Sequence, residues 1–139
     1  MATLLKVNKE NEKVNMTPEG IRNKLFYFEN AAHAFHQDTT GGWEHDALGK
    51  FYEALAEYKD DIPEKIMGYM GGKRIGGLKR DQIPPYSGKE SSIKLVEEII
   101  IFAKNLEEWA ESKEYCDISN IAQSLSGDAA KTMYRLSLK

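Results

Sequence analysis

Residues 31–66 read AAHAFHQDTTGGWEHDALGKFYEALAEYKDDIPEKI. Apolar residues recur at intervals of three and four on both sides of the segment DTTGG, which is the pattern of two amphipathic helices. The polar residues and glycines of that segment break the first helix and form a tight turn. The stretch therefore predicts a helical hairpin, and it holds all three histidines of the chain, His33, His36 and His45.

The first helix of this hairpin is expected to start at Thr17-Pro18-Glu19. Threonine is a favourable N-cap, proline fits the first helical position, and an acidic residue is favourable at the positive end of a helix. The spacing then predicts one inward-facing stripe, formed by Ile21, Leu25, Phe28, Ala32 and Phe35.

The second helix is expected to begin near Trp43. Proline removes an amide donor, so Pro63 predicts a kink or a fresh helical turn after Asp60. The apolar face is predicted to consist of Leu48, Phe51, Leu55, Tyr58, Ile62 and Ile66.

Residues 68–92 form a long connection rich in glycine and proline, which we expect to cross from one end of the molecule to the other. Ser91 or Ser92 is expected to cap a third helix, and Asp117 or Ser119 to start a fourth. Two hairpins joined by one long crossover make an all-α, ferritin-like four-helix bundle over residues 17–139, with residues 1–16 as an N-terminal arm. The inward residues expected in the last two helices are Val96, Ile99, Ala103, Leu106, Ala110, Ile118, Ala122, Leu125, Ala129 and Leu136.

The composition excludes several classes of protein. The 139 residues suit one domain, and 41% hydrophobic with 29% charged residues indicates a globular chain. The net charge of −3 gives no global attraction to nucleic acid or to anionic membranes, so we expect weak or no nucleic-acid binding. Cys116 is the single cysteine, and no apolar stretch is long enough for a signal peptide or a membrane span. We therefore expect a cytoplasmic protein without membrane contact.

The histidines and a carboxylate pair suggest a metal site. His36 and His45 flank the tight turn, so they can meet at one end of the hairpin, and Asp60 and Glu64 share a helix face because they are four residues apart. Asp60, however, is fifteen residues beyond His45, which is roughly 22 Å along a helix. Metal–ligand bonds are only about 2 Å long, so one chain cannot join the two pairs.

Two chains can join them. If two copies of the second helix pack antiparallel about a two-fold axis, His45 of one copy lies opposite Asp60 of the other. This arrangement predicts two identical sites per dimer, each with His36 and His45 from one subunit and Asp60 and Glu64 from its partner. His33 is an additional candidate, either as a ligand or as a neighbour of the ligands.

Residues 45–66, HDALGKFYEALAEYKDDIPEKI, resemble the second helix of Dps-type mini-ferritins, in which a histidine, an aspartate and a glutamate follow the spacing of His45, Asp60 and Glu64. The chain looks still closer to small phage-encoded ferritin-like proteins, through His33, His36, Thr39 and residues 45–55. The loop between His36 and His45 is shorter than in most Dps proteins, and Pro63 directly precedes Glu64.

The resemblance implies an iron protein that oxidises Fe(II) at a mono-iron or di-iron site, with zinc as the alternative metal. It also implies a homo-oligomer, such as a dodecamer, which would store iron if it encloses a cavity. For a phage protein the location would be the host cytoplasm or the virion. The alternative function is a non-catalytic phage structural protein, or one that binds a host factor, on the same scaffold.

Other charged residues have simpler interpretations. Glu44, Glu53 and Glu57 are expected to be helix-surface charges, with a place in an interface as the alternative for Glu53 and Glu57. Asp61 is expected to be a solvated neighbour of the site. The glycine-rich segment GYMGGKRIGG at 68–77 lacks the order of a phosphate-binding loop, and no strand precedes it. We expect this connection to be a solvated loop with at most salt-sensitive contacts to nucleic acid. Its basic residues are Lys73, Arg74, Lys79 and Arg80.

Overall fold

A computed structural model describes residues 16–139, and the expected N-terminal arm, residues 1–16, lies almost entirely outside this range. The described residues form four helices, with no strand among them: α2 (Pro18–Asp38), α3 (Gly42–Tyr69), α4 (Lys89–Ser112) and α5 (Cys116–Leu136). Within residues 16–139, the prediction of an all-α fold with four helices is confirmed. In residues 16–139 we find no helix with the length and apolar character needed to cross a membrane.

The helical hairpin begins and turns as the sequence predicts. Thr17 caps α2, since its hydroxyl oxygen accepts a hydrogen bond of 3.0 Å from the Gly20 amide, and Pro18 occupies the first turn. Helix α2 ends at Asp38 and α3 begins at Gly42, so only three residues separate the two helices.

Pro63 does not end α3, and the expected serine caps of α4 are wrong. Helix α3 continues through Pro63, whose side chain is buried, to Tyr69, so no separate helix starts after Asp60. Helix α4 starts at Lys89 after Gly88, whose φ of 112° suits glycine, and is therefore not capped by either serine. Ser92 instead lies in the first turns of α4 with its side chain fully buried.

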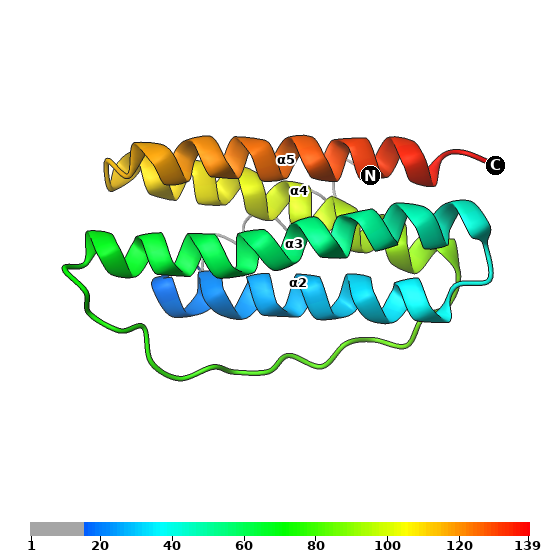
Figure 1. The fold of residues 1–139 in the computed structure, drawn as a ribbon, viewed down its shortest axis with the longest axis horizontal. Helices are drawn as coiled ribbons and strands as arrows, with labels where there is room; N and C mark the ends of the chain where they lie inside the picture. The colour runs from blue at the N-terminus through cyan, green and yellow to red at the C-terminus, as the bar shows by residue number, and fades with distance from the viewer. Residues whose placement is uncertain (1–15) are drawn as a thin grey trace.

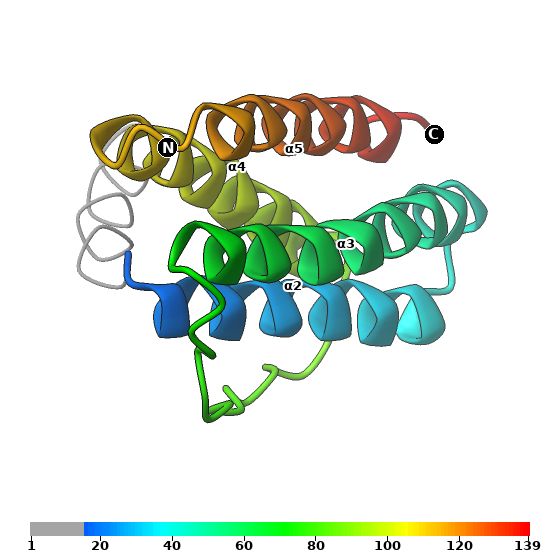
Figure 2. The ribbon, with the colours of Figure 1, turned by 60° about the vertical axis from the view of Figure 1, so that its left-hand side comes forward.

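The core lies where the four apolar stripes meet. All the predicted inward residues are buried except Tyr58, which is half-buried and donates a hydrogen bond of 2.6 Å to Asp128. Each helix packs against two others, in the cyclic order α2, α3, α5, α4 (Figures 1 and 2). The largest fully buried side chains are Phe28, Phe51, Phe102, Ile21, Leu25, Leu48, Leu55, Ile62, Ile66, Ile99, Leu106 and Ile118.

The segment between α3 and α4 is extended and lies outside the bundle along α2 (Figures 1 and 2). It leaves the end of α3 and reaches the start of α4 at the opposite end of the molecule (Figure 1). Ile75 is its one buried residue, at 8% exposure. The Arg22 side chain donates a hydrogen bond to the Gly77 carbonyl, and the Lys79 amide donates one of 3.1 Å to Asn23. These contacts fix the path of the connection along α2.

Glu44 is a buried carboxylate, which contradicts its expected place on the helix surface. Its side chain is only 6% exposed. The Tyr86 hydroxyl lies 2.8 and 2.9 Å from its two oxygens, and Ser92 donates a hydrogen bond of 2.7 Å. Glu44 also lies in the first turn of α3, where negative charge is favourable. We call these three residues the Glu44 clamp, because they join the starts of α3 and α4 to the connection.

Removing one donor from the Glu44 clamp should destabilise the fold. In Tyr86→Phe the buried carboxylate keeps only Ser92 as a partner, so we expect the free energy of unfolding to fall by about 1–3 kcal/mol. Urea unfolding followed by circular dichroism measures this change. Tyr134→Phe is the matched control, because Tyr134 is 63% exposed, and it should change the stability by less than about 0.5 kcal/mol. Equal effects of the two substitutions would contradict the importance of the clamp.

Candidate metal-binding site

His36 and His45 face each other across the turn between α2 and α3. Their ring centroids are 3.8 Å apart and their planes are inclined by 22°, so the two imidazoles are stacked. His36 is half-buried in the last turn of α2, and His45 is exposed in the first turn of α3. The expectation that the turn brings these two histidines together is confirmed.

The two histidines exchange hydrogen bonds with each other's backbone. Nδ1 of His36 lies 2.8 Å from the carbonyl oxygen of His45, and Nδ1 of His45 lies 2.9 Å from that of His36. A carbonyl oxygen only accepts, so each Nδ1 must carry the hydrogen. In the neutral rings both Nε2 atoms therefore keep their lone pairs. The bond from Nδ1 of His45 also gives a partner to the His36 carbonyl, which lies in the last turn of α2 and has no partner within the helix.

This arrangement suits metal binding. Histidines that bind a metal through one ring nitrogen usually donate the other N–H to a carbonyl or carboxylate, which fixes the orientation of the ring. His36 and His45 both do so. In the neutral form of both rings, the pair therefore offers two nitrogen donors on oriented rings, which suit iron, zinc, copper or nickel.

Gly49 allows the His36 ring to reach its position. A Cβ atom at this position would lie 3.0 Å from Cε1 and 3.2 Å from Nδ1 of His36, so the ring rests directly on the helix backbone. This role of Gly49 was not predicted from the sequence. A glycine inside an otherwise regular helical pattern was the available signal, because such residues often mark a close approach to the backbone.

His33 belongs to the same aromatic cluster but has a different partner. Its ring stacks on Tyr52, with centroids 4.1 Å apart and an angle of 12°, and lies 6.3 Å from the His36 ring. Tyr52 also makes an edge contact with His36 at 5.1 Å. His33 therefore lies beside the histidine pair rather than within it, and its role as a ligand stays a prediction.

Asp60 and Glu64 form a carboxylate pair on the exposed surface of α3. A hydrogen bond with Asp60, followed by the negative charge of Asp60, raises the pKa of the Glu64 carboxyl. The negative charge of Asp60 disfavours a second negative charge beside it, which is the reason for this rise. A bound cation would favour the ionised form of Glu64.

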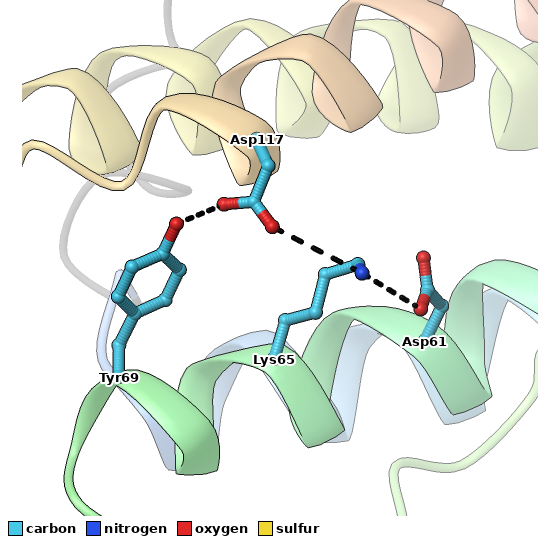
Figure 3. Close-up of polar contacts among 4 residues, drawn as sticks. All are labelled: Asp61, Lys65, Tyr69 and Asp117. Carbon is cyan, nitrogen blue, oxygen red and sulfur yellow. Dashed lines mark hydrogen bonds and ion pairs between the residues drawn. The ribbon is translucent and has the colours of Figure 1, made fainter.

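Asp61, expected to be a solvated neighbour of the site, is exposed and also engaged in an ion pair. It forms an ion pair of 3.5 Å with Lys65, whose amine also lies 3.9 Å from Asp117 of α5 (Figure 3). Tyr69 donates a hydrogen bond to the same aspartate, and this bond raises the pKa of Tyr69 to about 12. The four side chains join α3 to α5 and direct Asp61 toward Lys65.

The histidine pair and the carboxylate pair stay apart within one chain. Helix α3 is continuous from His45 to Glu64, so the fifteen residues between His45 and Asp60 span roughly 22 Å. In the part of the chain that the structure describes, no three His, Cys, Asp or Glu side chains are grouped so that they could hold a metal ion. A site with both kinds of ligand therefore needs a second chain.

Comparison with known proteins adds no relative to this description. No protein-family model, no curated protein and no solved structure matches the chain. What the site can bind therefore rests on its own donor atoms, namely two imidazole nitrogens at one end of α3 and two carboxylates further along it.

Substitution of Gly49 should disturb the histidine pair specifically. In Gly49→Ala the new methyl group displaces the His36 ring, so His36 should lose its Nδ1 hydrogen bond and revert toward the Nε2–H form. Nitrogen-15 NMR of the imidazoles in alkaline buffer distinguishes the two forms. Gly68→Ala is the matched control in the same helix, since nothing lies within 4 Å of a Cβ there. An unchanged Nδ1–H form of His36 in Gly49→Ala would contradict the proposed contact.

Proposed function

We propose that this protein binds Fe(II) and oxidises it at a site shared between two subunits of a two-fold dimer. The observation that carries the proposal is the reciprocal pair of hydrogen bonds between His36 and His45, which leaves both Nε2 atoms available as oriented donors. Asp60 and Glu64 of the partner subunit would complete the ligand set.

The length of α3 supports a shared site. The two ligand pairs lie roughly 22 Å apart on one continuous helix, and an antiparallel copy of that helix brings the opposite pair to each end. The dimer would then contain two identical sites. The expected homo-oligomer follows from this requirement, and a dodecamer or a closed shell that stores iron would be built from such dimers.

The mixed ligand set suits iron oxidation. Imidazole nitrogens bind Fe(II), and the negative carboxylates favour the higher charge of Fe(III). Each Fe(II) gives up one electron. Peroxide can accept two such electrons and, with two protons, leaves as two molecules of water; dioxygen is the other candidate oxidant. Zinc, which does not change its oxidation state, would occupy the same donors without this reaction.

The fold is compatible with the resemblance to Dps-type and phage-encoded ferritin-like proteins. The extended connection along α2 supports a ferritin-like crossover between α3 and α4, with α3 antiparallel to α5 (Figure 1). A fold can host several functions, so the function rests on the histidine and carboxylate pairs rather than on the fold. The non-catalytic alternative uses the same scaffold without Fe(II) oxidation.

A complementation experiment tests the shared site. His45→Ala damages one half of every site and Asp60→Ala the other, so each variant alone should lose Fe(II) oxidation. After the two variants are unfolded, mixed in equal amounts and reassembled, half of the dimers should be mixed. One site of each mixed dimer then contains no substitution, so about a quarter of the wild-type activity should return.

Two controls accompany this experiment. Wild-type protein is taken through the same cycle, and Asp61→Ala serves as the matched acidic variant, because Asp61 is exposed and pairs with Lys65. Asp61→Ala should keep its activity. No recovery in the mixture, with a fully active control, would reject a site shared between subunits. Full activity of either single variant would reject that residue as an essential ligand. Inactive wild-type protein would favour the non-catalytic alternative.

A further inference from the structure

A cleft of about 580 Å³ lies between α2, the middle of α3 and residues 78–83 of the connection. Its lining includes two aromatic residues, Phe26 and Tyr27, and three basic residues, Lys59, Lys79 and Arg80. None of these residues belongs to the proposed metal site. The combination of rings and cations in one cleft is typical of sites that bind a flat ring with a negatively charged group.

The cleft is held open by contacts on the connection, so it is more than a gap beneath a loop. Hydrogen bonds from the Arg22 side chain to Gly77 and from the Lys79 amide to Asn23 fix one end. Ile83 packs against the core at the other end. A preformed cleft binds a ligand without the entropic cost of ordering the loop.

The positive charge of the cleft comes mainly from its connection side. Lys59 forms an ion pair of 3.5 Å with Glu29 and lies 4.9 Å from the centroid of the Phe26 ring, so its charge is partly neutralised. Lys79 and Arg80 are adjacent and exposed, and they line the cleft from the connection. Two neighbouring cations of this kind suit a phosphate group.

The remaining polar residues suit the other parts of a nucleotide. Asn30 is exposed at the cleft and offers both a donor and an acceptor to a base edge. Asp81 would repel a phosphate placed beside it, but its carboxylate can accept hydrogen bonds from sugar hydroxyls. Phe26 and Tyr27 are half-buried and supply apolar and aromatic surface for a base.

We propose that this cleft binds a nucleotide, through aromatic contact with the base and through Lys79 and Arg80 with the phosphate. The nucleotide is either free or part of a single strand. This proposal is independent of iron binding. It agrees with the expectation of weak or no binding to duplex nucleic acid, because the proposed site would hold one unpaired base and the chain carries a net charge of −3.

The experiment titrates the protein with adenosine monophosphate and follows the amide signals by NMR. Parallel titrations use adenosine, inorganic phosphate and a short single-stranded oligoadenylate. We expect adenosine monophosphate to bind with a dissociation constant of about 1 mM or lower, to shift signals of residues 23–30 and 78–83, and to bind more tightly than adenosine or phosphate. If oligoadenylate binds more tightly than adenosine monophosphate, the natural ligand is a single strand. If the two bind equally, it is a free nucleotide.

Variants separate the cleft from general electrostatic attraction. Lys79→Ala/Arg80→Ala should weaken the binding of adenosine monophosphate about tenfold or more. Lys73→Ala/Arg74→Ala removes the same charge from exposed residues of the same connection and should leave affinity nearly unchanged. Asn30→Asp, which adds a negative charge at the base edge, should also weaken binding. The proposal is overturned by an absence of shifts with both adenosine monophosphate and oligoadenylate, by equal losses in the two double variants, or by phosphate binding as tightly as the nucleotide.

Discussion

The exchange of hydrogen bonds between His36 and His45 is the interaction on which the proposed chemistry depends. Each ring donates from Nδ1 to the other residue's carbonyl, so one arrangement fixes both ring orientations and both tautomers. The short turn between α2 and α3 makes this exchange possible, and Gly49 leaves room for the His36 ring. The Glu44 clamp then fixes the first turn of α3, which carries His45. Local backbone geometry and a buried carboxylate thus support one pair of nitrogen donors.

The second constraint is the length of a continuous helix. Because α3 does not end at Pro63, the carboxylate pair stays roughly 22 Å from the histidines of its own chain. Asp60 and Glu64 are exposed, and the hydrogen bond and negative charge of Asp60 raise the pKa of Glu64. Two neighbouring carboxylates offer oxygen ligands for a cation, and an antiparallel partner helix would bring the histidines to them. This is why we connect the metal chemistry to the oligomeric state.

Features that depend on local periodicity were predictable from the sequence. The four inward stripes, the Thr17 cap and the meeting of His36 with His45 all follow from residue spacing and from the short turn. The burial of Glu44 was not predictable, because its partners Tyr86 and Ser92 are more than forty residues away in the sequence. The continuity of α3 through a proline likewise depends on packing against the core. The cleft beneath the connection depends on tethers such as that from Asn23 to Lys79, which local patterns do not reveal.

The most direct test of the shared site is a crystal structure of the protein grown with Co(II), a redox-stable substitute for Fe(II), with the metal located by its anomalous scattering. We predict a peak within about 2.3 Å of Nε2 of His36 or His45, and equally close to a carboxylate oxygen of Asp60 or Glu64 from a second chain. The two-fold axis should generate an identical second peak. A peak with ligands from one chain only, or no peak at these residues in metal-saturated crystals, would contradict the account.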